Sequence, residues 1–313
     1  MSKDNFNRII ESLEIKYVLS NMRKVVRSVE LLNTREEKDI IVQVKKGFFS
    51  AGDGDHKEHR QIPEGGFVFI PRDSIINFRH GIAPYDVIDT EGFTSPEQRE
   101  RYVRPIDPLK STSDSDHIFN ILAFEVSVYG AVPFFSMMQL PCIFMEPNEE
   151  LSNIIDCINS EEYGDGLGKK AMIRKYTDQL IIHLCRYIYE NPLYREQVSK
   201  LDYLLDRRLI SIIEYIQNNL EGDLSNQKIA DLAFVSRDYI GQFFKSLTNH
   251  NLQDYIENRR LEHAHFLLRS TTDSVQEIAR RVGFKDPAYF SRRFRMKYNQ
   301  KARDIRETDT MMA

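Results

Sequence analysis

Hydrophobic positions along this chain follow two different periods, and the change between them divides the sequence. Over residues 39–80, apolar and polar positions alternate in runs such as DIIVQVKKGFFSA and GGFVFIPRDSIINF, which are separated by turns containing Gly or Pro. Alternation with a period of two is typical of β-strands. Strand-like runs return in HIFNILAFEVSVYG and QLPCIFM. Many short strands with such turns favour an antiparallel barrel or sandwich, and we predict a barrel over residues 39–146.

Two further stretches of this half have their own character. Residues 89–116 are strongly polar, which predicts a long exposed loop. The most apolar window, residues 130–145, contains Ser136, Gln139 and two prolines, so it predicts buried strands and not a membrane span. The first residues lack the basic and then apolar order of a signal peptide. Together with three cysteines that show no metal-ligand spacing, these features predict a reduced, cytoplasmic protein without a membrane segment.

From residue 149 the pattern changes to a helical period, and we predict helices over residues 149–190. The segment 171–190 carries one apolar stripe at spacings of three and four. Such a stripe packs on its own domain or pairs with its copy in a second chain, and the pattern does not decide between the two. If it pairs, the protein is a homodimer. The dimer-helix candidates are Ile173, Tyr176, Leu180, Leu184 and Ile188.

The boundary between two domains is predicted near residues 196–206, where dense charge follows Pro192. We therefore expect a sensing or dimerisation domain over 1–195, a linker over 196–206, a helical domain over 207–306 and a tail over 307–313. From residue 207 onward there are 18 Lys and Arg against 14 Asp and Glu, which leaves 25 against 33 for the preceding part. A basic C-terminal unit on an acidic body is typical of a nucleic-acid-binding module attached to another domain.

The C-terminal part contains an internal repeat. SNQKIADLAFVSRDYIGQFF (225–244) and SVQEIARRVGFKDPAYFSRRF (274–294) each read as a capped helix, a short turn and a second helix. Ser225 and Ser274 are candidate N-caps, and Glu277 completes a capping box in the second copy. Ala230 and Ala279 are small enough for a close helix crossing, and Gly283 is expected at positive φ in the turn. This plan is a helix-turn-helix that occurs twice.

Between the two copies, residues 252–268 predict one helix of roughly 25 Å, at 1.5 Å per residue. A rod of this length can hold two recognition helices about 34 Å apart, which is one turn of B-DNA. The sequence thus predicts two DNA-reading helices and a spacer that joins them.

The segment IARRVGFKDPAYFSRRFRMKYNQKARDIR (278–306) resembles the signature of the AraC/XylS family of transcription regulators, and the resemblance covers about residues 208–306. Asn249 and Asn299 stand where this family commonly has glycine, and Lys301-Ala302 replaces the usual Thr-Pro. The resemblance implies that double-stranded DNA is the partner, with RNA polymerase and an unknown small-molecule effector as further partners. It also implies an N-terminal half that senses a signal or dimerises, through a cupin-like β-barrel.

The overall fold class predicted is therefore α+β and multidomain, with an N-terminal cupin-like antiparallel barrel and a C-terminal all-α domain. Arginine can bind guanine and glutamine can bind adenine through two hydrogen bonds each, and basic side chains also hold phosphates. Arg281 and Arg293 are expected in surface ion pairs instead. The predicted base contacts are Arg237, Asp238, Gln242, Ala288, Ser291 and Arg292, and the predicted phosphate contacts are Lys245, Lys285, Arg295 and Lys297.

A cupin-type small-molecule enzyme with an accessory helical domain is the alternative. Such an enzyme needs a converging set of metal ligands, and His56 and His59 lie three apart in a polar turn, so we expect them solvated. No cofactor, metal site or catalytic residue is predicted. The barrel interior is the expected place for an apolar ligand. Its candidate residues are Phe67, Phe69, Phe124, Phe134, Phe135, Met137 and Met138.

Overall fold

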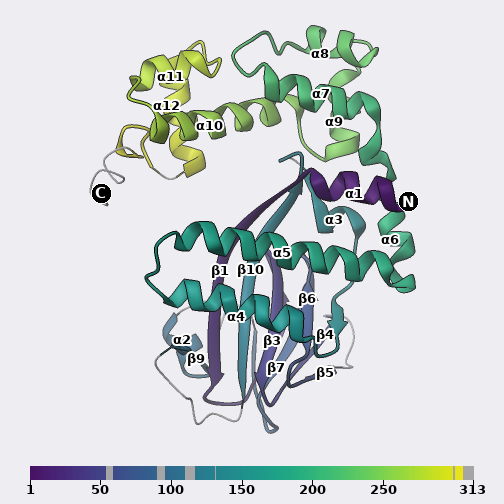
Figure 1. The fold of residues 1–313 in the computed structure, drawn as a ribbon, viewed down its shortest axis with the longest axis vertical. Helices are drawn as coiled ribbons and strands as arrows, with labels where there is room; N and C mark the ends of the chain where they lie inside the picture. Colours follow the sequence, from purple (N-terminus) through teal and green to yellow (C-terminus); the bar gives the residue numbers. More distant parts are fainter. Residues whose placement is uncertain (54–58, 90–95, 110–116, 131, 299, 306–313) are drawn as a thin grey trace. The chain divides into compact units, whose positions relative to one another are not determined.

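The computed structural model of the protein describes residues 1–313 except 54–58, 90–95, 110–116, 131, 299 and 306–313. The chain forms two compact units, Met1–Leu201 and Asp202–Ala313. Unit 1 is an α+β unit and unit 2 consists of helices (Figure 1). Among the described residues, no helix has the length and apolar character needed to cross a membrane.

Unit 1 contains a seven-stranded antiparallel sheet in which β1 and β10 form the longest pair. The order along the sheet is β12-β6-β3-β10-β1-β9, and the short strand β11 also pairs with β10. Its strands are β1 (Leu13–Val25), β3 (Asp39–Lys46), β6 (Phe67–Ile70), β9 (Val103–Pro105), β10 (Ile118–Val128), β11 (Val132–Pro133) and β12 (Ile143–Met145).

A second, five-stranded sheet has the order β5-β4-β7-β2-β8, and only its β2 and β8 run parallel. Over the described residues each sheet has two open ends, so the predicted closed barrel is replaced by two sheets. Alternation in sequence identifies strands but not their partners, which explains the error. The five strands are β2 (Val29–Arg35), β4 (Phe48–Asp53), β5 (Arg60–Pro63), β7 (Ile75–His80) and β8 (Asp86–Asp89).

The two sheets share a hydrophobic core, to which Phe49, Phe78 and Ile76 contribute from one sheet and Val68 and Phe119 from the other. The opposite face of the seven-stranded sheet is covered by α4 (Glu149–Tyr163) and α5 (Lys169–Glu190), as Figure 1 shows. A hydrogen bond also joins this helical layer to the sheet: Gln43 Nε2 on β3 donates to Ser152 Oγ of α4 at 2.8 Å. The helical period predicted for residues 149–190 is thus confirmed as two helices.

Several segments of unit 1 differ from the prediction. The strands β1 and β2 precede residue 39, where none was predicted, although Leu13, Ile15 and Tyr17 alternate with polar residues at the start of β1. Part of the predicted loop 89–116 forms α2 (Pro96–Glu100) and β9, whose Val103 is buried. In the predicted strands of residues 130–145, α3 (Phe134–Met138) forms a helical turn between β11 and β12.

Short helices fill the rest of unit 1 and the start of unit 2, including the segment predicted as a linker. They are α1 (Lys3–Glu11), η2 (Pro192–Tyr194), α6 (Arg195–Ser199) and η3 (Asp202–Leu205). The longer helices of unit 2 are α7 (Arg207–Asn218), α8 (Asn226–Ala233), α9 (Ile240–Thr248), α10 (Leu252–Ser270), α11 (Val275–Arg281) and α12 (Pro287–Tyr298). Helix α10 contacts α9 on one side of the unit and both α11 and α12 on the other (Figure 1).

Candidate nucleic-acid interface

The first helix-turn-helix is formed by α8 and α9. Ser225 caps α8, since its Oγ accepts from the backbone N–H of Lys228 at 3.4 Å. The turn passes through Phe234 at a φ of 55°, and the Val235 N–H donates back to the Ala230 carbonyl at 3.1 Å. Helix α9 begins only at Ile240, so the residues just before it belong to the turn.

The second helix-turn-helix is formed by α11 and α12, and its local signals act as predicted. Ser274 and Glu277 form the capping box, with the Ser274 N–H donating to Glu277 Oε2 at 2.7 Å. Gly283 has a φ of 89°, as expected for the turn. A carboxylate oxygen of Asp286 accepts from the Ala288 N–H at 2.8 Å and so satisfies an otherwise unpaired donor in the first turn of α12.

A cluster of aromatic side chains fixes α12 against the unit. Phe290 and Phe294 are completely buried and Phe284 is nearly so, with Phe284 and Phe290 rings at 5.2 Å in an edge-on contact. Leu261 and Ala264 of α10 belong to the same cluster. Because aromatic burial fixes one face of α12, the opposite face is held outward in a defined orientation.

That outward face brings together four of the predicted DNA contacts. All four are exposed and line one open hollow, together with Gln276 of α11 and Lys301 after α12. The four residues are Ala288, Ser291, Arg292 and Arg295. The Arg292 guanidinium lies over the Tyr289 ring at 5.3 Å, a cation–π contact that orients it. No ion pair holds Arg292 among the described residues, so its charge remains available to a partner.

The predicted contacts of the first copy are exposed but more scattered. Gln242 and Lys245 lie on α9, whereas Arg237 and Asp238 lie in the turn before it. Arg237 lines a different hollow, with Ser225 and the first residues of α8. Lys285 is exposed in the second turn. The predicted residues therefore form one compact group on the second copy and a looser one on the first.

Neighbouring charges show which basic residues are already engaged. Arg293 pairs with Glu257 of α10, and Arg281 pairs with Asp273 at 3.0 Å, which confirms both expected surface ion pairs. Lys297, predicted as a phosphate contact, donates to Glu262 Oε1 at 2.9 Å, and its side chain is 24% exposed. A phosphate would have to displace this bond.

Unit 1 contains a cavity of about 560 Å³ between its two sheets. None of the predicted ligand-pocket residues lines it. All of them except the half-buried Met137 are completely buried elsewhere; Phe69, for example, packs against Phe135 at 4.7 Å and Phe124 at 6.3 Å. Side chains alternate across a strand, so Phe67 and Phe69 of β6 lie on the face away from Val68 and Ile70, which join the core between the sheets.

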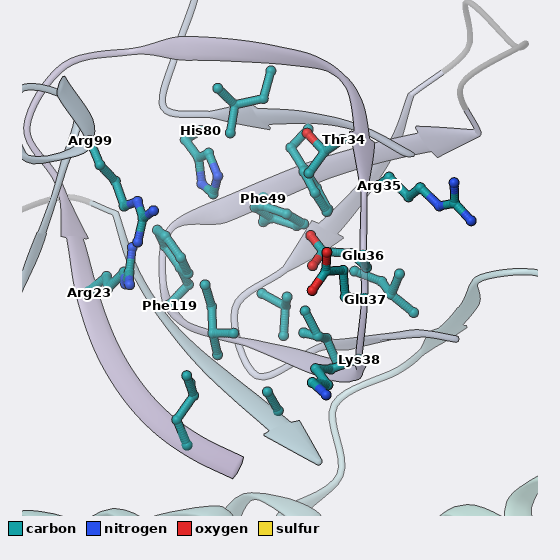
Figure 2. Close-up of a pocket in the computed structure, with 18 of the residues that line it drawn as sticks. Arg23, Thr34, Arg35, Glu36, Glu37, Lys38, Phe49, His80, Arg99 and Phe119 are labelled. Carbon is teal, nitrogen blue, oxygen red and sulfur yellow. The ribbon is translucent and has the colours of Figure 1, made fainter. Parts of the chain in front are cut away.

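Residues that the sequence analysis missed line the cavity instead. Figure 2 shows Arg23 and Arg99 at one side, His80 beside Phe49 and Phe119, and the pair Glu36 and Glu37 across the view. One signal was present in the sequence. In IINFRH of β7 the inward positions are Ile76, Phe78 and His80, so a histidine occupies a place that alternation assigns to the core.

The other predicted sites of unit 1 also have defined surroundings. Ile173, Leu180, Leu184 and Ile188 are buried within the chain and Tyr176 is half-buried, so a dimer contact through α5 would use the opposite face of the helix.

His59 is not solvated as expected, because its side chain is 5% exposed and its Nε2 lies 3.3 Å from Glu30. His56 falls outside the described residues. Across the described ranges, no three His, Cys, Asp or Glu side chains are grouped to hold a metal ion.

Comparison with known proteins points to unit 2. A family described as a helix-turn-helix domain matches residues 229–308. The HTH-type transcriptional activator RhaS of Enterobacter sp. (strain 638) is similar over 102 residues, with 32% identity, 33% of this chain and 37% of the relative covered. The putative HTH-type transcriptional regulator YkgA of Escherichia coli (strain K12) is similar over 116 residues, with 30% identity and coverage of 37% and 48%.

The chain thus spans between about a third and a half of the length of these relatives. Among solved structures, a transcriptional regulator with an AraC-type DNA-binding domain from Chromobacterium violaceum has 29% identity and a TM-score of 0.30. That likeness covers 32% of this chain and 89% of the other.

Proposed function

We propose that this chain, whose C-terminal unit carries an AraC-type helix-turn-helix domain, is a sequence-specific DNA-binding transcription regulator. The resemblance predicted from the sequence is confirmed for that domain. One observation carries the proposal: both helix-turn-helix copies have buried apolar side chains along their helices, and α10 contacts α9 of the first copy and both helices of the second. In this proposal unit 1 binds an effector, dimerises, or does both, and the protein acts in the cytoplasm.

The second copy supplies the strongest candidate for reading bases. Arg292 is exposed, stacked on Tyr289 and surrounded by Ser291, Ala288 and Arg295 in one hollow. A guanidinium held in this way can donate two hydrogen bonds to guanine O6 and N7. We propose Arg292 and Gln242 as the main base-reading residues, with the remaining base contacts as lesser ones. They are Arg237, Asp238, Ala288 and Ser291.

Basic side chains around these residues would position the domain on the phosphates. Lys245, Lys285 and Arg295 are exposed and serve this role in the proposal, whereas Lys297 would first have to leave Glu262. Contacts of this kind add affinity without sequence preference and are lost as salt rises.

Selection from random double-stranded DNA by the full-length protein tests the proposal. We expect enrichment of a site with two short elements about one helical turn apart, because each copy can enter one major groove. The matched control is the double variant Gln242→Ala, Arg292→Ala, which should bind weakly and enrich nothing. Uniform, salt-sensitive binding without enrichment in the wild-type protein would contradict sequence-specific recognition.

A further inference from the structure

The cavity between the two sheets of unit 1 has the size and walls of a small-molecule site. Its volume of about 560 Å³ falls within the range of ordinary ligand pockets, roughly 300–1,000 Å³. His80 and Phe119 stack with ring centroids 4.6 Å apart, and Phe49 lies 4.9 Å from His80 (Figure 2). Leu31 and Ile121 complete an apolar wall. Flat aromatic walls favour a ligand with a flat, apolar body.

Three polar groups in this cavity lack hydrogen-bond partners although their atoms are buried. They are Nδ1 of His80, Nε of Arg23 and Oγ1 of Thr34. His80 itself is only 7% exposed. Buried polar atoms in folded proteins nearly always have a partner, and leaving one unpaired costs free energy. Three such atoms around one cavity point to a bound molecule that supplies the partners.

Charge is unevenly distributed around the cavity. Arg23 and Arg99 lie together, and burial and the nearby Arg99 charge both lower the pKa of Arg23. In the described part of the chain, no carboxylate comes within ion-pair distance of Arg23. Glu36 and Glu37 lie across the view in Figure 2, where burial and the second carboxylate raise the pKa of Glu36. At that end Arg35 and Lys38 also line the cavity, but they pair with Asp73 and Glu125. The Arg23 end is therefore the one that attracts an anion.

His80 is suited to bind a ligand without adding charge. Burial and the charge of Arg23 lower the pKa of His80 to about 3, so the ring is neutral at ordinary pH. A neutral imidazole carries one donor and one acceptor nitrogen. It can therefore accept from, or donate to, a polar atom beside the anionic group.

We propose that this cavity binds a small organic acid with a flat, apolar body, its anionic group held by Arg23 and Arg99. The apolar body lies against Phe49, Phe119 and His80. This ligand class rests on the proposed function, in which unit 1 receives an effector. Binding itself does not require DNA, so the two proposals can be tested separately.

The test compares two fluorescent probes that share their rings and differ in charge. Anilinonaphthalenesulfonate carries a sulfonate, and N-phenylnaphthylamine does not. We expect the full-length wild-type protein to bind the sulfonate probe at one site, at least about tenfold more tightly than the neutral probe. Equal affinity for the two probes, or no saturable binding of the sulfonate probe, would overturn the proposal.

Variants locate the site. Arg23→Met should lower the affinity for the sulfonate probe about tenfold and leave the affinity for the neutral probe nearly unchanged. Arg23→Lys should retain most of the affinity for the sulfonate probe. Arg27→Met is the matched control, since Arg27 is 65% exposed, pairs with Asp86 and does not line the cavity. Ala123→Phe, which fills the cavity from β10, should weaken the binding of both probes. Equal effects of the Arg23 and Arg27 variants would overturn the assignment.

The same protein preparations separate this proposal from the regulator proposal. Selective binding of the sulfonate probe without any enriched DNA site would contradict only sequence-specific DNA recognition. An enriched DNA site without selective binding of the sulfonate probe would contradict only the ligand class. Thermal unfolding of each variant provides the check that it is folded.

Discussion

The two helix-turn-helix copies share one backbone plan but use different residues to hold it. In both, an N–H after the turn bonds back to an alanine carbonyl, Val235 to Ala230 at 3.1 Å and Phe284 to Ala279 at 2.9 Å. The left-handed turn residue is Phe234 in one copy and Gly283 in the other. Phe234 is 93% exposed, so its side chain meets no packing demand. The comparison teaches that packing around the turn, more than the turn itself, decides which residue is required.

The outward faces of the two copies differ in chemistry as well. The second has Arg292 and Arg295 in one hollow, while the first has Gln242 and Lys245 on a helix that begins at Ile240. Guanidinium groups make stronger, charge-assisted hydrogen bonds than an amide does. We therefore expect the second copy to contribute more of the DNA specificity than the first.

The largest effect should come from adding one methyl group to the second turn. A Cβ at Gly283 would lie 2.6 Å from the Leu220 carbonyl oxygen and 2.7 Å from Arg260 Cζ, in addition to the strain of positive φ. We expect Gly283→Ala to lower the free energy of unfolding by about 2–3 kcal/mol. Denaturant-induced unfolding followed by circular dichroism measures the change.

Gly241 in α9 provides the matched control. A Cβ there meets nothing within 4 Å, and alanine favours a helix. Gly241→Ala should raise the stability by up to about 1 kcal/mol, the opposite sign from Gly283→Ala. Equal destabilisation by both substitutions would show that packing at Gly283 has no special role.

The second prediction compares base reading in the two copies. Arg292→Ala should weaken binding to the selected site by roughly 1–3 kcal/mol and relax one base position, since a bidentate contact is lost. Gln242→Ala should weaken binding to the same site by less, about 1 kcal/mol, because a neutral amide makes weaker hydrogen bonds than a guanidinium does. Titrations on the selected site and on single-base variants of it measure both. An equal loss for Arg292→Ala on all sequences would mean that Arg292 contacts only phosphate.

The two units also differ in how much of their structure could be predicted from the sequence. In unit 2 the signals are local: Ser274 with Glu277, Gly283 and the spaced aromatics Phe290 and Phe294 fix each element within a few residues. The spacer predicted over 252–268 is observed as Leu252–Ser270. Short-range hydrogen bonds and helical period are visible in a single sequence.

In unit 1 the deciding contacts are distant in sequence. Strand β6 is buried on both faces, so its apolar run does not reveal that Val68 and Phe69 face different neighbours. The cavity is lined by residues from Val18 to Ala123, and several strands must pair before Arg23 and His80 meet. Alternation shows which side chains of a strand share a face, but not which strands become its neighbours in the sheet.

The third prediction concerns the helix caps. The second copy has a reciprocal capping box, with Ser274 Oγ accepting from Glu277 N–H at 3.2 Å and Glu277 accepting in return. The first has a single, longer bond from Lys228 N–H to Ser225 Oγ at 3.4 Å. We expect Ser274→Ala to cost about 1 kcal/mol of stability and Ser225→Ala about half of that. Larger destabilisation by the Ser225 change would reverse this ranking of the copies.

The smallest effect should come from giving the first turn the residue of the second. Phe234→Gly removes an exposed ring and relieves a left-handed conformation that costs a non-glycine residue about 1 kcal/mol or more, while glycine loses more chain entropy on folding. Because these two effects oppose each other, we expect the free energy of unfolding to rise by only about 0.5 kcal/mol. Denaturant-induced unfolding of the variant and the wild type measures this difference. Phe234→Ala is the control, because it removes the ring but keeps the strained backbone and should gain nothing. If Phe234→Gly lowers the stability, the ring contributes to folding despite its exposure, and the turn of the first copy is held by packing after all.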